Sequence, residues 1–177
     1  MRAAYISFLV PILSFYSCAP HAVQPTPTVA LCRTEAHFSR PGGAAPALIN
    51  VLDQAQTSIH VAMYGLTNSQ IVDALLAAKR RGVDVALKTD KIESARKTQA
   101  GMISRLQAAG VPVEISEQTR FLHHKFAVID GRYVVTGSYN WTDNAERRNR
   151  ENLVILECPE MAQVFNAEWD LIQRDTP

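Results

Sequence analysis

Apolar residues recur along this chain at two different spacings, which separate predicted helices from predicted strands. Apolar positions every three or four residues predict amphipathic helices, at residues 44–55, 69–81, 94–109 and 161–173. Short apolar or alternating stretches predict strands, at residues 34–39, 58–66, 83–89, 111–116, 126–129, 132–136 and 152–156. Because helices and strands alternate, the pattern predicts a layered α/β/α domain, in which helices flank a mixed central sheet.

Two details of this pattern restrict the sheet further. Asp130-Gly131 separates residues 126–129 from residues 132–136, and this dipeptide is typical of the two-residue turn of a β-hairpin. Residues 152–156 are almost continuously apolar, which predicts a strand that is buried in the centre of the sheet.

The first 30 residues differ from the rest of the chain. Arg2 precedes an apolar stretch, residues 3–16, and small residues and prolines follow it. This order is typical of a secretory signal peptide with a Pro-rich leader, and a buried N-terminal helix is the alternative. We therefore expect residues 31–177 to form a single catalytic domain that is exported, periplasmic or secreted. Cleavage after Ala30 and lipoprotein anchoring through Cys18 both remain open.

Two cysteines, Cys32 and Cys158, lie in the predicted domain. Export to an oxidising compartment favours a disulfide between them. Two buried free thiols are the alternative, and the sequence does not decide between the disulfide and the free thiols.

The net charge of the predicted domain gives no support to nucleic-acid binding. The chain has 18 basic and 17 acidic side chains, and Arg2 is the only charged residue before position 31, which leaves 18 − 1 = 17 of each sign. The basic residues are nevertheless clustered, in residues 79–105 and again at Arg147, Arg148 and Arg150. Either cluster could follow a phosphate backbone, and a solvated surface is the alternative.

The residues around the predicted hairpin suit an anion better than an apolar core. Side chains alternate along a strand, so His123 and Lys125 share one face and His124 points to the other. Histidine can act as a nucleophile or as an acid and base near neutral pH. Lysine can stabilise a phosphoryl oxygen, and Ser138 and Asn140 add neutral donors two residues apart.

The spacing of these residues resembles the HKD motif of the phospholipase D superfamily. The motif reads His-x-Lys, four residues, Asp, six residues, and Gly-Ser-x-Asn. The resemblance extends from about Phe38 to Trp169 and is closest to the small bacterial endonucleases that carry one motif per chain. It implies a phospholipase D-like fold and phosphodiester chemistry, and it does not fix the substrate.

The resemblance also assigns roles to individual residues. His123 would be the nucleophile that forms a covalent phosphohistidine, and a second histidine of the same kind would protonate the leaving oxygen. Lys125, Ser138 and Asn140 would bind the non-bridging phosphate oxygens.

Two acidic residues complete the implied catalytic set. Glu151 precedes Asn152, as in the related endonucleases, and would hold an imidazole through its far nitrogen; a solvent-facing glutamate is the alternative. Asp130 belongs to the motif, but alternation sends it to the other face and Asp is favoured before Gly in turns. We therefore interpret Asp130 as shaping the site, with no role in proton transfer.

The sequence implies no cofactor and no metal, because neither a metal-ligand constellation nor a Gly-rich nucleotide loop is visible. The chemistry needs two histidines, yet the motif occurs once. His21, His37 and His60 have no lysine two residues on. A homodimer with a shared active site would supply the second histidine.

Three functions remain open from the sequence. The first is an exported phosphodiesterase that acts as a nuclease on DNA or RNA. The second is a phospholipase D that acts on glycerophospholipids. The third is a binding module without activity, against which the intact motif and Glu151 argue.

Overall fold

The computed structural model describes residues 32–116 and 121–172, so the predicted signal peptide and leader, residues 1–30, lie outside the described residues. The strands are β1 (Arg33–Phe38), β2 (Ser58–Met63), β3 (Asp84–Asp90), β4 (Val113–Ser116), β5 (Lys125–Ile129), β6 (Tyr133–Gly137) and β7 (Asn152–Glu157). The helices are α1 (Ala44–Gln54), α2 (Ser69–Arg80), α3 (Lys91–Ser94), α4 (Lys97–Ala108), α5 (Asp143–Arg147) and α6 (Pro159–Leu171).

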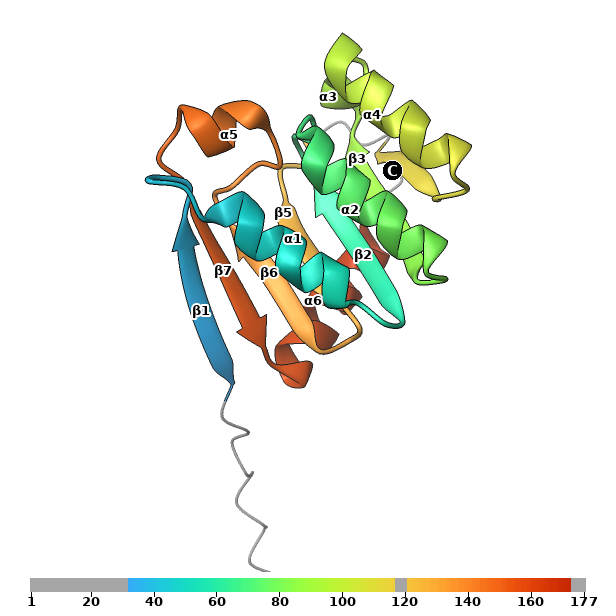
Figure 1. Ribbon diagram of the computed structural model, residues 1–177. Coiled ribbons are helices and arrows are strands. Elements are labelled where there is room, and N and C mark those ends of the chain that lie inside the picture. Colours follow the sequence, from blue (N-terminus) through green and yellow to red (C-terminus); the bar gives the residue numbers. More distant parts are fainter. Residues whose placement is uncertain (1–31, 117–120, 173–177) are drawn as a thin grey trace, which may run out of the picture.

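The seven strands form one mixed sheet in the order β1-β7-β6-β5-β2-β3-β4, with β5 in the middle (Figure 1). The β2–β3 and β3–β4 pairs are parallel and the other pairs are antiparallel. The predicted hairpin is therefore present as β5 and β6.

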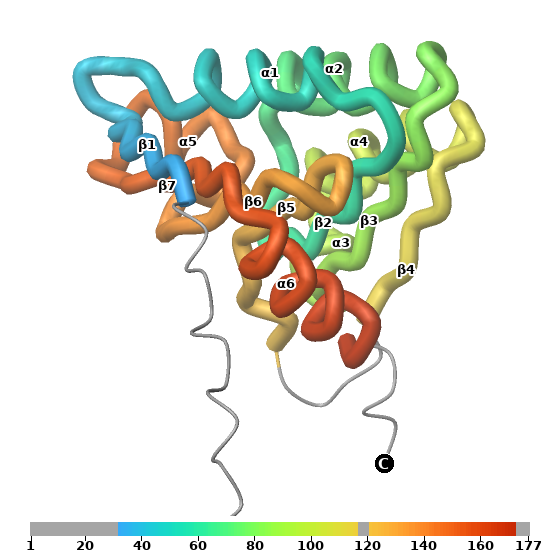
Figure 2. Tube along the Cα trace, turned by 90° about the horizontal axis from the view of Figure 1, so that it is seen from below, coloured from blue at the N-terminus to red at the C-terminus, as the bar shows by residue number. Residues whose placement is uncertain are grey.

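Helices cover both faces of the sheet. Helices α1 and α2 lie on one face and α6 on the opposite face, which the view along the sheet makes clear (Figure 2). Strand β5 is buried on both sides: Ala127 and Ile129 belong to the main core, whereas Phe126 and Val128 pack in a smaller core with α6. The predicted layered α/β/α class is confirmed.

The structure corrects two predicted elements. The helix predicted at residues 94–109 begins later, as α4 at Lys97, because Arg96 has an extended backbone. A separate short helix, α3, which Asp90 caps, precedes it. The strand predicted to be central, β7, lies next to the edge strand β1. Leu153 is buried but the neighbouring Val154 is only partly covered. Strand β7 is therefore almost continuously apolar in sequence, but only one of its two faces is fully buried.

The sequence pattern did not predict helix α5, a single short helix between β6 and β7. Thr142 caps it by accepting a hydrogen bond from the backbone N–H of Ala145 at 3.1 Å. Helix α5 and the residues just after it carry the second basic cluster, and α5 lies near the end of the sheet where β5 begins (Figure 1).

Cys32 and Cys158 are joined in a disulfide, with their Cα atoms 4.8 Å apart. The register of the two edge strands explains the pairing, because Arg33 lies opposite Glu157 in the antiparallel β1–β7 ladder and the next residues outward are the cysteines. Of the two alternatives that the sequence left open, the structure has the paired form. No helix within residues 32–116 and 121–172 has both the length and the apolar character needed to cross a bilayer.

Candidate active site

Four residues of the HKD motif, His123, Lys125, Ser138 and Asn140, lie at the end of the sheet where β5 begins and β2 and β6 end. Helix α5 lies on one side of this end and α3 on the other (Figure 1). His123 is exposed and Lys125 is half-buried at the start of β5. The Nζ atom of Lys125 donates a hydrogen bond to the backbone carbonyl of His123 at 2.7 Å, so the ammonium group lies beside the histidine.

His124 points away from this site, as strand alternation predicts. Its Nε2 atom lies 3.0 Å from Oε1 of Glu168 on α6. Its ring packs against the edge of Phe126, with ring centroids 5.3 Å apart. The two adjacent histidines therefore have different surroundings, and only His123 shares a face with Lys125.

Ser138 and Glu151 contact each other directly. The Ser138 hydroxyl donates to Oε2 of Glu151 at 2.5 Å and accepts from the backbone N–H of Asn152 at 3.1 Å. The other carboxylate oxygen of Glu151 accepts from Nδ2 of Asn149 at 2.8 Å. Within the described residues Glu151 makes no hydrogen bond to His123, so the implied contact with an imidazole is absent within one chain.

The loop that carries Ser138 and Asn140 is held tightly against its neighbours. Gly137 has φ +150°, and a Cβ at this position would lie 2.2 Å from the backbone oxygen of Asn152, so only glycine fits. The side chain of Asn140 lies against Gly65, whose added Cβ would approach it to 3.3 Å. Trp141 is buried and donates from its backbone N–H to Gly65 at 2.9 Å.

Burial has a larger effect on the pKa of Lys125 than the neighbouring charges have. Partial burial lowers the pKa of Lys125 from its ordinary value, and the negative charge of Glu151 opposes this change. The ammonium also lies over the ring of Tyr64, 5.0 Å from the centroid. A partly desolvated cation interacts more strongly with a phosphoryl oxygen than one in bulk water does.

Asp130 lies apart from the other residues of the motif, at the opposite end of β5. Seven residues of extended chain separate it from His123, roughly 20 Å. Its carboxylate accepts hydrogen bonds from the backbone N–H groups of Gln56, Thr57 and Ser58 at 3.0, 2.7 and 3.0 Å, and from the Thr57 hydroxyl at 2.9 Å. Asp130 therefore ties the hairpin to the α1–β2 connection, and in this chain it does not lie beside His123 and Lys125.

The backbone and the pKa of Asp130 agree with this structural role. Asp130 and Gly131 both have positive φ, 55° and 58°, as the central residues of a type I′ turn require. Burial alone would raise the pKa of Asp130, but the hydrogen bonds from the three backbone N–H groups and from Thr57 outweigh it and hold the pKa below its ordinary value.

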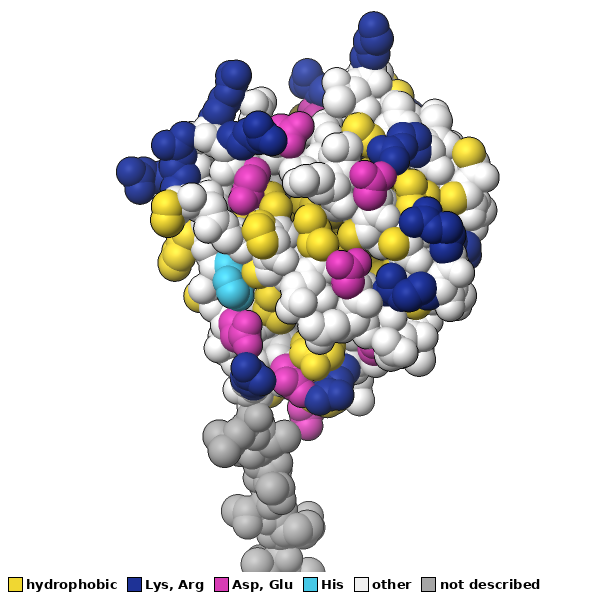
Figure 3. Space-filling view, viewed as in Figure 1, with side chains coloured by type: hydrophobic (Ala, Val, Ile, Leu, Met, Phe, Trp, Pro, Cys, Tyr) yellow, Lys and Arg dark blue, Asp and Glu magenta, His cyan; other side chains and the backbone are white. Residues whose placement is uncertain are grey.

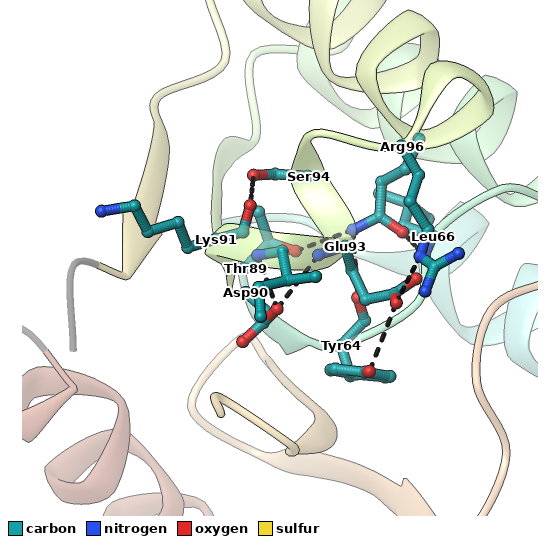
Figure 4. A network of polar contacts seen from close by, with 10 residues as sticks. Tyr64, Leu66, Thr89, Asp90, Lys91, Glu93, Ser94 and Arg96 are labelled. Atoms are coloured by element: carbon teal, nitrogen blue, oxygen red, sulfur yellow. Dashed lines mark hydrogen bonds and ion pairs between the residues drawn. The ribbon is translucent and has the colours of Figure 1, made fainter. Parts of the chain in front are cut away.

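Tyr64 is a site residue that the sequence reasoning missed. Its ring lies 4.5 Å from the His123 ring, centroid to centroid, and its hydroxyl donates to Oε1 of Glu93 at 3.3 Å (Figure 4). The same Glu93 oxygen accepts from Nε of Arg96 at 2.7 Å. Burial and the adjacent Glu93 carboxylate raise the pKa of the Tyr64 hydroxyl, so it donates a hydrogen bond at neutral pH.

Two buried polar residues hold the segments that carry Tyr64 and His123. Asp90 caps α3 with one carboxylate oxygen and accepts from the backbone N–H of Leu122 with the other, at 3.1 Å. Gln99 donates to the backbone oxygen of Tyr64 at 3.0 Å and accepts from the N–H of Leu66 at 2.8 Å. Asp90 could have been recognised from the sequence, because an Asp that follows a strand is a favourable N-cap for a helix. No sequence pattern points to Gln99.

The two predicted basic clusters differ in the structure. In residues 79–105 several cations have structural contacts. Lys88 is buried beside Glu114 and Trp169, and Arg81 donates to backbone carbonyls at the C-terminal end of α1. Arg147, Arg148 and Arg150 lie at the end of α5 and just after it. Figure 3 shows dark-blue side chains gathered at the corner formed by α5 and the turn after β1.

One group in the described part of the chain could bring three metal-binding atoms together, namely Cys32, Cys158 and Glu160. The disulfide uses both sulfur atoms, so these residues do not offer thiolate ligands in this state.

The comparisons with known proteins identify the family. The profile of the family described as "Cardiolipin synthase, PLD-like domain" matches residues 48–172. The chain belongs to the phospholipase D superfamily. Among solved structures it resembles Nuc from Salmonella typhimurium, a phospholipase D family member, with a TM-score of 0.77 and 30% identity over 79% of this chain and 93% of that chain.

Other relatives carry different names. NucT from Helicobacter pylori shares the fold, with a TM-score of 0.68 and 22% identity over 80% of this chain and 96% of that one. The phospholipase D of Rickettsia conorii is 35% identical over 75% of this chain and 65% of its own length. The mitochondrial cardiolipin hydrolase of Chlamydomonas reinhardtii is 30% identical over 78% of this chain and 61% of its own length. The chain thus spans slightly less than two thirds of these curated relatives.

Proposed function

We propose that this protein is a phosphodiesterase that hydrolyses phosphodiester bonds through a covalent phosphohistidine at His123, and that its substrate is DNA or RNA. The observation that carries the proposal is the meeting of an exposed His123, the Lys125 ammonium and the Ser138–Asn140 loop at one end of the sheet, in a chain of the phospholipase D superfamily.

The proposed reaction has two steps. A ring nitrogen of His123 attacks phosphorus, the bond from phosphorus to the leaving oxygen breaks, and a second histidine gives a proton to that oxygen. Water then attacks phosphorus, gives its proton to the second histidine, and the phosphorus–nitrogen bond breaks. Lys125 and the Asn140 amide stabilise the negative charge on the non-bridging oxygens in both steps.

The second histidine is proposed to come from another copy of the chain. In a two-fold dimer the active site would lie on the axis, with His123 of both chains facing one phosphate. The absence of a Glu151–His123 hydrogen bond within one described chain is compatible with a contact across such an interface. Glu151 would then orient an imidazole of the partner.

Subunit mixing tests the shared site. Wild-type protein is mixed with an equal amount of His123→Ala chain, and exchange of subunits is verified by mass. A shared site leaves roughly a quarter of the activity per total protein, because only wild-type pairs work, whereas independent sites leave about half. A mixing curve that is linear in the wild-type fraction, or a fully active monomer, contradicts the shared site.

Nucleic acid is preferred as the substrate because of the arginines at α5. Arg147 and Arg148 lie at the end of α5, and Arg150 lines a hollow together with Glu151. Such a cluster suits a repeating phosphate backbone, and the chain resembles Nuc in fold. A phospholipase D activity is the second candidate, which the names of the Rickettsia and Chlamydomonas relatives favour.

A side-by-side assay decides between these substrates. Purified protein, residues 31–177, is offered single-stranded DNA, duplex DNA, RNA and glycerophospholipid vesicles, each with and without excess EDTA. We expect cleavage of nucleic acid that persists in EDTA, because Lys125 and the loop amides supply the charge stabilisation. Loss of activity in EDTA that a divalent cation restores would refute the metal-independent mechanism, and turnover of the vesicles alone would transfer the proposal to lipid.

We also propose that the protein acts outside the cytoplasm, which the Cys32–Cys158 disulfide supports because such bonds persist in oxidising compartments. Fractionation of cells that express the full chain tests this, with the protein expected in the periplasm, the medium or a lipid-anchored fraction. Recovery of a reduced, uncleaved protein from the cytoplasm would contradict it.

A further inference from the structure

A hollow of about 430 Å³ lies beside Glu151, and it is lined by Phe38, Arg40, Arg150, Glu151 and Asn152. Phe38 is 60% exposed although it is a large apolar residue. The hollow adjoins the motif, because Glu151 and Asn152 both hydrogen-bond to Ser138. None of the assigned catalytic roles uses Phe38, Arg40 or Arg150.

The walls of the hollow are held together by a set of cross-links. Phe38 lies opposite Asn152 in the β1–β7 ladder. The backbone N–H of Ser39 donates to the oxygen of Glu151 at 3.0 Å, and the N–H of Glu151 donates to Oγ of Ser39 at 2.9 Å. Arg40 donates from Nη2 to the backbone oxygen of Arg147 at 2.5 Å. The hollow is therefore built in the free protein and does not need to be formed by the ligand.

The chemistry of the walls indicates which ligand fits. An exposed aromatic ring offers a stacking surface for a base, and stacking requires a base that is not inside a duplex. Guanidinium groups bind phosphate through paired donors and also stack on planar groups. A ring and two guanidinium groups at one hollow thus match one unpaired nucleotide, with its base on Phe38 and its phosphate at Arg40 and Arg150.

We propose that this hollow is a nucleotide subsite next to the scissile phosphate and that it makes single-stranded nucleic acid the preferred substrate. The inference rests on the proposed nuclease function and adds the strand preference. Contact with the same surface of a second copy is disfavoured as the main use of the hollow, because an isologous interface would bring the arginines of both chains together.

The test compares Phe38→Ala and Arg150→Ala with two matched controls far from the hollow. Arg80→Ala removes an exposed arginine of α2, and Val164→Ala truncates an apolar side chain of α6 that is 60% exposed, as Phe38 is. Values of kcat/KM are measured on a single-stranded oligonucleotide, on the duplex of the same sequence and on bis(p-nitrophenyl) phosphate. Thermal unfolding of each variant verifies that it is folded.

Phe38→Ala is expected to lower kcat/KM on the single strand about tenfold more than on the small diester, in line with the loss of one stacked base. The loss on duplex should be smaller than on the single strand. Arg150→Ala should weaken binding of the single strand. It should also make binding less dependent on salt, so that the slope of log K against log salt concentration becomes shallower by about one unit. Both control variants should stay within about twofold of wild type on all three substrates.

Equal losses on oligonucleotide and small diester would overturn the subsite, since Phe38 would then serve the reaction centre or the fold. An effect no larger than that of Val164→Ala, or a larger loss on duplex than on single strand, would overturn it as well. If the nuclease proposal itself is wrong, the wild-type protein will cleave no nucleic acid, which distinguishes this outcome from a failure of the subsite alone. Glycerophospholipid vesicles are offered as an additional substrate, and a loss in Phe38→Ala and Arg150→Ala that is confined to the vesicles would assign the hollow to a lipid headgroup and refute the nucleotide subsite.

Discussion

The two ends of β5 carry acidic and basic residues of the same motif but use them differently. At the first end His123 is exposed and Lys125 is only partly covered. At the other end the carboxylate of Asp130 accepts four hydrogen bonds from residues 56–58. A charged group with its hydrogen bonds already made stabilises the fold, whereas one that is held in place but accessible can meet a substrate.

The hydrogen-bond partners of each residue distinguish the two roles. His123 and Asp130 are both part of one sequence signature, and spacing alone does not distinguish their roles. Their partners do, because the partners of Asp130 are backbone N–H groups of a neighbouring loop, while His123 is bordered by a ring and an ammonium group. Variants at the first end of β5 should therefore change turnover, and variants at the Asp130 end should change stability.

Replacing the proposed nucleophile should abolish turnover without unfolding the protein. His123→Ala is expected to reduce kcat by about 10⁴-fold or more, because the covalent step is lost. The free energy of unfolding should change little, because the side chain is exposed. The matched control is His124→Ala, which removes the neighbouring imidazole and its Glu168 contact; if His124 proves to be the histidine that cannot be replaced, the assignment fails.

Lys125 should show its role through its charge and its pKa. Lys125→Met is expected to lower kcat/KM by roughly 10²- to 10³-fold, because a donor to the charged transition state is lost. Burial lowers the pKa of Lys125 from 10.5. The ammonium therefore loses its proton as the pH rises through this lowered pKa, and activity should decline over the same interval.

Lys125→Arg separates charge from geometry in this prediction. Arginine stays charged to higher pH, so any remaining activity should decline at higher pH than in the wild type. A pH profile whose alkaline limb is identical in wild type and Lys125→Arg would show that another group causes the decline.

Tyr64 should act by positioning, which predicts a smaller effect. Tyr64→Leu removes the ring beside His123 and is expected to lower kcat about tenfold with little change in KM, because the imidazole loses its packing partner. Tyr64→Phe keeps the ring and should remain within about threefold of wild type. A larger loss in Tyr64→Phe than in Tyr64→Leu would assign the role to the hydroxyl and its Glu93 contact.

Asp130→Ala should have the smallest effect on turnover and a clear effect on stability. We expect the free energy of unfolding to fall by about 1–2 kcal/mol, a value reduced for the exposure of the carboxylate, while kcat/KM per folded molecule is retained. The folded pKa is depressed below 3.8, so the stabilisation is complete above the unfolded pKa and disappears as the pH falls through the folded pKa.

Urea unfolding of both proteins between pH 7 and pH 2 measures this difference. The gap between wild type and Asp130→Ala should narrow below pH 3.8. A constant gap over the whole range would mean that the charge of Asp130 contributes nothing, and a large loss of kcat/KM at full folding would return Asp130 to the catalytic set.

The spacing of apolar residues was sufficient to predict the layers, the hairpin and most element positions. It failed where burial depends on distant segments: β7 is as apolar as a central strand but lies beside the edge. It also missed α5, whose five residues are too few to show a helical period.

The candidate site was predictable where the chemistry is local in sequence. His123, Lys125, Ser138 and Asn140 follow from one motif and from strand alternation. Tyr64, Phe38 and Gln99 could not be found in this way, because each comes to the site from a different part of the chain. Strand order and loop contacts bring these residues to the site, and neither can be read from local patterns in the sequence.

Trapping the covalent intermediate shows directly which histidine attacks phosphorus. A labelled oligonucleotide is mixed with wild type, His123→Ala and His124→Ala, the reactions are stopped within milliseconds by alkaline denaturant, and the labelled peptides are mapped by mass spectrometry. We expect an acid-labile phosphoramidate on His123, still esterified to one fragment of the cleaved strand, in wild type and His124→Ala, and none in His123→Ala. A label on His124, or rapid turnover by wild type with no protein-bound oligonucleotide fragment, would contradict the assignment of His123 as the nucleophile.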